Sequence, residues 1–112
     1  MKACRPYLIH ILQEIKYLSG ESSHLSYEEF ASDETLKRAF VRSLEIIGEA
    51  VKNIPDSVRQ KYPAIDWRRI AGMRDKLIHA YFGINYHLIW SVLQNELPDL
   101  EAQIQKILSE IE

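Results

Sequence analysis

Residues 66–90 read DWRRIAGMRDKLIHAYFGINYHLIW, and the rest of the chain is organised around this segment. Within it, Arg74, His79 and Tyr81 form the spacing Arg-x4-His-x-Tyr in surroundings that are otherwise largely apolar. A permanently charged guanidinium and an imidazole that titrates near neutral pH are costly to bury. We therefore expect these side chains to line a cleft rather than to enter the core.

The segment is predicted to form a helix that begins at Asp66 and ends near Gly83. Asp66 is a good N-cap residue, and glycine is the usual residue just beyond the end of a helix. Pro63 interrupts the chain before this helix, and Asn85 can cap the next one. The residues expected to supply its apolar contacts are Trp67, Ile70, Ala71, Leu77, Ile78 and Tyr81.

Hydrophobic periodicity predicts three further main helices on either side of this one. The first follows Pro6 and runs to Gly20, before a polar loop at 21–24. A capping box at Ser26 and Glu29 predicts a short helical turn, and Asp33 or Ser32 caps a long helix with apolar residues through Ile54. A short helix is expected at 56–62, and a last helix from Asn85 onward is kinked at Pro98.

Four main helices joined by short loops bury their apolar stripes most simply as an up-and-down bundle. No alternating strand pattern competes with this assignment. The 112 residues have room for a single core, so residues 1–112 are predicted to form one all-α domain with short extra helices.

Charge is segregated along the chain, although the net charge is only −2. Residues 59–79 carry six basic and two acidic side chains, whereas residues 96–112 carry one basic and five acidic side chains. Any contact with nucleic acid must therefore come from a local patch. Arg68, Arg69 and Lys76 are candidates for steering RNA, although a solvated face is the favoured reading of the two arginines.

The single cysteine, Cys4, excludes an intramolecular disulfide framework, and no Cys/His cluster has the spacing of a zinc site. The N-terminal residues are interrupted by polar side chains at helical spacing, unlike a signal peptide, and no stretch approaches a membrane span. These features fit a cytoplasmic protein.

Three blocks beside the motif carry a resemblance to a known family. LEIIGEA at 44–50, KYPAIDWRRIAGMRDKLIHAYFGI at 61–84 and IWSVLQNELPDL at 89–100 resemble successive blocks of the HEPN superfamily, in particular the HepT-like toxins that are paired with small nucleotidyltransferases. Arg-x4-His-x-Tyr is the signature of that family. Asp75 departs from its pattern, because asparagine often follows the arginine there. An acid at this position would partly neutralise Arg74.

On a continuous helix Arg74 and His79 point about 140° apart, whereas Arg74 and Tyr81 lie within about 20° of each other. Two arrangements would still unite Arg74 with His79. The helix end could unwind before Gly83, or the site could combine residues from two chains. The resemblance implies the second arrangement, a homodimer whose two motifs face each other across a cleft.

The resemblance implies an endoribonuclease that needs neither metal nor cofactor, the toxin of a type VII-like toxin–antitoxin system. His79, with a reference pKa of about 6.5, can act as base or acid at neutral pH. Arg74 can hold the phosphate and stabilise its developing charge. Tyr81 would be the residue to which the nucleotidyltransferase antitoxin attaches AMP, which would switch the nuclease off. A buried tyrosine with a hydrogen-bonded hydroxyl is the structural alternative.

Other interpretations remain open at this point. The chain could be a non-catalytic subunit that binds nucleotide or RNA, with Asp75 spoiling nuclease chemistry, or a purely structural dimeric bundle. Glu49 lies between Gly48 and Ala50, small residues that would let another helix come close. It is read first as a solvated glutamate and second as a group that orients Arg74. Trp67 and Trp90 are expected in the core or at an interface, and stacking of an exposed Trp67 on RNA is the alternative.

Overall fold

The computed structural model describes residues 2–79 and 83–111. Within these ranges the chain forms one short 3-10 helix and seven α-helices, and no strand. The elements are η1 (Lys2–Cys4), α1 (Arg5–Ser22), α2 (Tyr27–Ala31), α3 (Glu34–Lys52), α4 (Asp56–Lys61), α5 (Trp67–Ile78), α6 (Tyr86–Asn95) and α7 (Leu97–Glu110).

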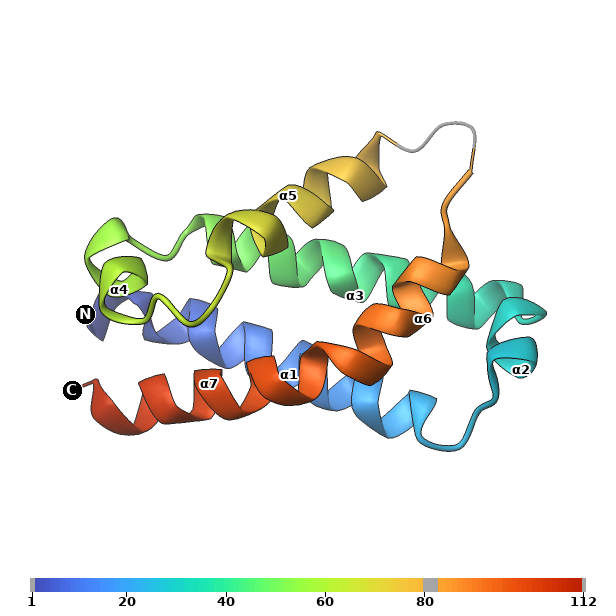
Figure 1. The fold of residues 1–112 in the computed structure, drawn as a ribbon, viewed down its shortest axis with the longest axis horizontal. Coiled ribbons are helices and arrows are strands. Elements are labelled where there is room, and N and C mark those ends of the chain that lie inside the picture. The colour runs from blue at the N-terminus through green and yellow to red at the C-terminus, as the bar shows by residue number, and fades with distance from the viewer. Residues whose placement is uncertain (1, 80–82, 112) are drawn as a thin grey trace.

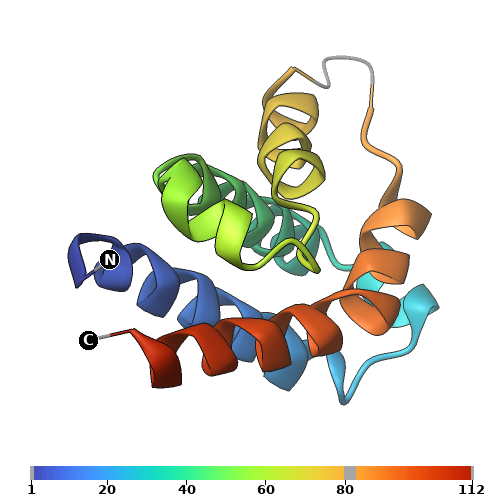
Figure 2. The ribbon, with the colours of Figure 1, turned by 60° about the vertical axis from the view of Figure 1, so that its left-hand side comes forward.

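The long helices form a bundle in which α3 contacts both α1 and α5, and α1 contacts α7. Figures 1 and 2 show α1 and α7 side by side, with the two ends of the chain at the same end of the bundle. The C-terminal helical region is broken at Glu96, where α6 ends and α7 begins with Pro98 in its first turn. The predicted all-α bundle with a kinked C-terminal helix is confirmed.

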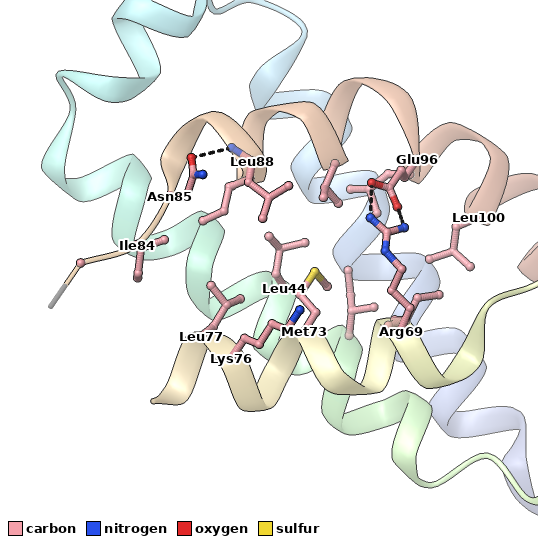
Figure 3. A pocket seen from close by; sticks show the side chains of 16 residues that line it. Leu44, Arg69, Met73, Lys76, Leu77, Ile84, Asn85, Leu88, Glu96 and Leu100 are labelled. Atoms are coloured by element: carbon pink, nitrogen blue, oxygen red, sulfur yellow. Dashed lines mark hydrogen bonds and ion pairs between the residues drawn. The ribbon is translucent and has the colours of Figure 1, made fainter. Parts of the chain in front are cut away.

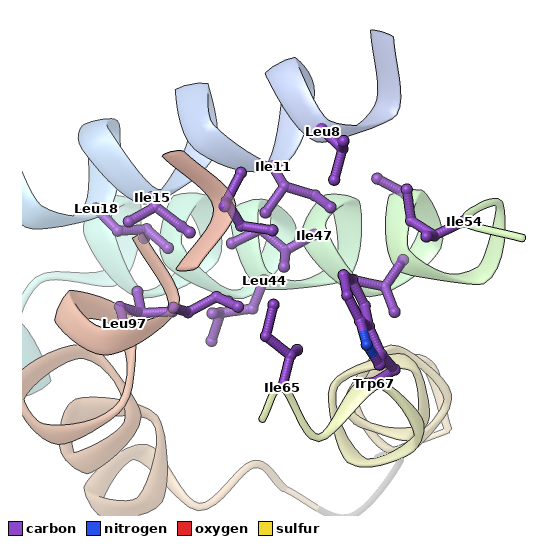
Figure 4. Packing of buried hydrophobic residues seen from close by; sticks show 14 of the residues in the cluster. Leu8, Ile11, Ile15, Leu18, Leu44, Ile47, Ile54, Ile65, Trp67 and Leu97 are labelled. Carbon is purple, nitrogen blue, oxygen red and sulfur yellow. The ribbon is translucent and has the colours of Figure 1, made fainter. Parts of the chain in front are cut away.

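The core is formed by the apolar stripes that the periodicity predicts (Figure 4). Residues of α1 and α3 face each other, and residues of α7 close the third side. Fully burying one leucine or isoleucine stabilises the fold by about 1.5–3 kcal/mol. The fully buried residues of α1 and α3 are Leu8, Ile11, Ile15, Leu18, Phe40, Leu44, Ile47 and Val51.

Side-chain caps set the starts of four described helices, as predicted, and three of them are α2, α3 and α6. Ser26 accepts a hydrogen bond from the backbone N–H of Glu29 at 3.1 Å, and the Glu29 carboxylate accepts one from the Ser26 N–H at 2.9 Å. Asp33, rather than Ser32, caps α3 by accepting from the N–H of Leu36 at 3.0 Å. Asn85 caps α6 by the same kind of bond.

The first helix ends later than its sequence predicts. α1 continues through Gly20 to Ser22, so the expected loop at 21–24 begins two residues late. Among the described residues only Gly83 has a positive φ, and Gly20 therefore keeps an ordinary helical backbone. The hydroxyl of Ser23 donates to the carbonyl of Gly20 at 2.9 Å and helps to satisfy the end of the helix.

Aromatic rings attach α2 and α6 to the bundle. The ring of Phe30 stacks on Phe40 of α3 and on Trp90 of α6, with centroids 5.1 and 5.3 Å apart. Tyr27 stacks on His87 with centroids 4.0 Å apart. Trp90 is thus a packing anchor, as expected, and α6 is held against α2. In the part of the chain that the structure describes, no helix has the length and apolar character needed to cross a membrane.

Candidate functional site

The start of α5 is anchored in the core, and this positions the motif helix. Asp66 accepts a hydrogen bond from the N–H of Arg69 at 3.1 Å, which confirms it as the N-cap. Trp67 is only 5% exposed, and its indole N–H donates to the carbonyl of Tyr62 at 3.0 Å. Trp67 is therefore a core residue, and the alternative that it stacks on RNA is wrong.

Gly48 lets α5 approach α3 closely at Arg74. A Cβ built on Gly48 would lie 2.5 Å from the Cβ of Arg74 and 3.1 Å from the carbonyl oxygen of Ile70. Only a residue without a side chain fits there. The close approach places the Arg74 Nε 3.0 Å from a carboxylate oxygen of Glu49. The ion pair with Arg74 that the second interpretation of Glu49 requires is thus present.

Asp75 binds two cations at the same place. Its Oδ1 lies 2.9 Å from Nη1 of Arg74 and 2.7 Å from Nζ of Lys52 on α3. The hydrogen bonds from Lys52 and then from Arg74 lower the pKa of the Asp75 carboxyl below its usual value. Among the described residues, two carboxylates bind the Arg74 guanidinium through Nε and Nη1, and Nη2 is left as the group that can meet an anion. The Arg74 side chain is 31% exposed, so solvent reaches it.

His79 caps the C-terminus of α5 and is exposed. Its backbone N–H donates to the carbonyl of Asp75 at 3.2 Å, and its ring Nδ1 lies 2.8 Å from the same oxygen. Because a carbonyl oxygen can only accept, Nδ1 must carry the hydrogen. The neutral imidazole therefore has its lone pair on Nε2, the atom that can take a proton from a substrate.

The end of α5 differs from the prediction. The helix ends at Ile78, and His79 follows as its C-cap, so Gly83 is not the stop. Gly83 has a φ of +132°, which serves the connection to α6. Among the described residues no hydrogen bond or ion pair joins Arg74 to His79, and Asp75 connects them. Tyr81 lies outside the described residues. The prediction that Tyr81 shares a helix face with Arg74 concerns the same part of the chain.

The three candidates for RNA steering lie in different surroundings. Arg68 is exposed on α5. Arg69 forms a two-pronged ion pair with Glu96, with Nη2 2.8 Å from Oε2, and this pairing raises the pKa of Arg69. Lys76 and Arg69 border a mostly apolar pocket of about 270 Å³. Figure 3 shows the Arg69–Glu96 pair at one end of this pocket and Asn85 near the other.

The basic patch is more neutral in the fold than its sequence predicts. The basic segment 59–79 meets the acidic segment 96–112 at Arg69 and Glu96, and the Tyr62 hydroxyl donates to Glu110 at 2.6 Å. The bond to Glu110 raises the pKa of Tyr62 to about 12. Two opposite charges that are 27 residues apart along the chain, Arg69 and Glu96, are thus paired in space.

A second pocket, of about 290 Å³, contains Arg74 itself. Tyr7 and His10 of α1 line it together with Glu49 and Asn53 of α3. His10 is exposed on α1, and its place beside Arg74 was not foreseen from the sequence. Tyr7 and His10 are three residues apart and thus share a helix face. This spacing is the sequence pattern that could have indicated that the two side chains lie together. Among the described residues, no group of three His, Cys, Asp or Glu side chains is arranged to hold a metal ion.

Comparison with known proteins relates this chain to ribonucleases. A family model described as "Ribonuclease HepT-like" matches residues 8–107. The chain is 56% identical over 108 residues, 96% of each chain, to "Putative RNase TTE0752" of Caldanaerobacter subterraneus subsp. tengcongensis. It is 39% identical over 103 residues, 92% of this chain and 94% of the relative, to "Probable ribonuclease HepT" of Thermococcus cleftensis. No solved structure matches the chain significantly.

Proposed function

Because the chain belongs to the HepT-like ribonuclease family of the HEPN superfamily, we propose that it is an endoribonuclease toxin that cleaves RNA without a metal ion at a site on α5. The observation that carries this proposal is the pair formed by the half-buried Arg74 and the exposed His79, both held by Asp75 at the end of the motif helix. An arginine with donors toward solvent and an imidazole with a defined basic nitrogen suit phosphodiester cleavage.

His79 moves protons and Arg74 binds charge in this reaction. The Nε2 of His79 takes the proton of the ribose 2′-hydroxyl, and the 2′ oxygen attacks the adjacent phosphorus. The bond from phosphorus to the 5′ oxygen breaks, and that oxygen must receive a proton. The products are a 2′,3′-cyclic phosphate and a 5′-hydroxyl. Arg74 stabilises the negative charge that develops on the phosphoryl oxygens.

A second histidine from a second copy of the chain supplies the proton for the leaving oxygen. The exposure along α5 supports a homodimer, because Trp67 is the only buried residue in the span 67–78 that the structure describes as this helix, and Ile78 is 43% exposed. A two-fold dimer with α5 at its interface would bring two motifs to one cleft. The charge of two Arg74 side chains would then meet one phosphate.

Tyr81 is the proposed site of control. It follows His79 by two residues in the sequence, so an AMP attached to its hydroxyl would bring a phosphate to the catalytic site. That phosphate would bind Arg74 in place of RNA. The enzyme that attaches AMP would be a cognate minimal nucleotidyltransferase, the antitoxin of the pair. Tyr81→Phe should prevent the mass increase of one AMP when the chain is incubated with that enzyme and ATP.

One observation favours a second candidate function, a non-catalytic subunit that binds nucleotide or RNA. The Arg74 guanidinium is already bound by Glu49 and Asp75, which compete with a phosphate for its donors. This candidate function predicts RNA binding without cleavage. A cleavage assay with the purified protein therefore distinguishes the two candidate functions.

The test is cleavage of a labelled single-stranded RNA by the purified protein in the presence of a metal chelator. We expect His79→Ala to lower the rate about 10²–10⁴-fold and Arg74→Ala about 10²–10³-fold. Arg38→Ala changes an exposed arginine of α3 that lines neither pocket, and it serves as the control that keeps activity. Binding without cleavage by the wild type, or equal cleavage by all variants, would reject the proposed site.

A further inference from the structure

The pocket that contains Arg74 has a lining that suits an aromatic ligand. It lies where α1, α3 and α5 meet and has a volume of about 290 Å³. Four large apolar side chains are exposed in the described part of the chain, and two of them, Tyr7 at 36% and Ile78 at 43%, line this pocket. An exposed tyrosine ring beside an exposed isoleucine offers a flat group two apolar contacts.

Charge in this pocket is balanced, which argues against a site for a second phosphate. Arg42 and Glu45 form one ion pair at 3.6 Å, and Arg74 and Glu49 form another at 3.0 Å. The lining adds hydrogen-bonding groups that carry no fixed charge, chiefly His10 of α1. A neutral ligand with polar edges fits this set better than a second anion does.

Asn53 adds a polar group whose orientation is fixed. Its side-chain N–H donates to the carbonyl of Glu49 at 3.0 Å, which orients the amide at the end of α3. Its side-chain oxygen is thereby the atom that can accept from a ligand. Unpaired RNA bases are recognised by stacking on aromatic side chains and by hydrogen bonds to their edges. Tyr7, His10 and Asn53 provide both kinds of group on the border of a single pocket.

We propose that this pocket binds one nucleoside of the RNA, the one next to the phosphate that Arg74 holds. The base stacks on Tyr7, and His10 and Asn53 contact its polar edge. This inference rests on the proposed function for the role of Arg74. It makes α1, which carries no part of the Arg-x4-His-x-Tyr motif, a determinant of where RNA is cut.

The test measures binding of the four 3′-nucleoside monophosphates and of inorganic phosphate by NMR titration of the full chain. Tyr7→Ala should weaken nucleotide binding roughly 5- to 150-fold, the range for loss of one stacked base. It should leave phosphate binding unchanged. Tyr17→Ala is the matched control, because Tyr17 lies on the same helix and is 38% exposed but does not line the pocket. His10→Ala should change the ratio of affinities among the four bases.

Equal nucleotide affinity in Tyr7→Ala and Tyr17→Ala would overturn the proposal. So would a loss of dimer affinity in Tyr7→Ala, measured by sedimentation, with nucleotide binding unchanged, because the pocket would then be a protein contact. Nucleotide binding that depends on Tyr7 in a protein that cleaves no RNA would support the subsite and reject the nuclease. RNA cleavage by the wild type, with nucleotide binding that does not depend on Tyr7, would support the nuclease and reject the subsite.

Discussion

Replacing Gly48 by alanine should force α5 away from α3 at Arg74. The added methyl carbon would lie 2.5 Å from the Arg74 Cβ and 3.2 Å from its backbone nitrogen. Carbon atoms in ordinary contact are roughly 3.5–4.0 Å apart, so the helices must separate by about 1 Å. Neither obstacle is the flexible end of a side chain, and relaxation must therefore move backbone.

Two opposing terms set the size of the effect. Overpacking of this kind costs about 1–3 kcal/mol, whereas alanine is favoured over glycine inside a helix by about 1 kcal/mol. Gly20→Ala isolates the second term, because a Cβ at Gly20 meets nothing within 4 Å. The free energy of unfolding of Gly48→Ala should thus lie about 1–3 kcal/mol below that of Gly20→Ala.

Chemical denaturation followed by circular dichroism measures this difference directly. The reasoning is refuted if Gly48→Ala stabilises the protein as much as Gly20→Ala does. A separation of 1 Å also displaces the guanidinium from a bound phosphate, and such a displacement can cost about 100-fold in rate. The rate of RNA cleavage by Gly48→Ala should accordingly be lower than that of the wild type by up to about 100-fold. Gly20→Ala should remain fully active.

Three further predictions concern pH and capping. The pKa of Tyr62 is raised from 10.0 to about 12 by its bond to Glu110, so that bond stabilises the fold below pH 10 and its contribution is lost as pH rises to about 12. As pH rises through this range, the melting temperature should fall more steeply for the wild type than for Tyr62→Phe. Parallel plots of melting temperature against pH would contradict this. The pKa of Asp75 is lowered, chiefly by Lys52, so its stabilisation is present above 3.8 and lost as pH falls below that value. The gap in melting temperature between wild type and Asp75→Asn should therefore be present at neutral pH and close in acid; a gap that persists would argue against it. Ser26→Ala removes half of the capping box and should cost about 1 kcal/mol in denaturant titration, whereas an unchanged midpoint would show that the cap is unimportant.

Local features of the fold could be predicted from the sequence because their partners are close along the chain. The caps at Asp66 and Asn85 each bind an N–H three residues later, which a sequence pattern can reveal. The ends of α1 and α5 could not be predicted in the same way. Gly20 continues a helix and Gly83 lies beyond one, so the residue type alone does not tell a helix end from a helix interior.

The site was predictable in residue type but not in geometry. Gly48 and Ala50 marked a place where a helix could approach, and the approach occurs at Arg74. Lys52 was not singled out, because its bond to Asp75 spans 23 residues and depends on how α3 and α5 pack. The pairing of Arg69 with Glu96 likewise joins segments 27 residues apart. The basic patch predicted from sequence is consequently smaller in the fold.

The most direct test of the account is the chemistry of the cut, because attack by the 2′-hydroxyl leaves a defined product. An RNA with one known cleavage position is compared with the same RNA carrying a single 2′-deoxy sugar there, in chelator, with wild type and His79→Asn. Asparagine can keep the bond to the Asp75 carbonyl while removing Nε2. We predict a 2′,3′-cyclic phosphate and a 5′-hydroxyl from the wild type, no cut at the deoxy position, and cleavage by His79→Asn that is slower by about 10²–10⁴-fold. Cleavage of the deoxy substrate at that position, or undiminished cleavage by His79→Asn, would contradict attack by the 2′-hydroxyl with His79 as the base.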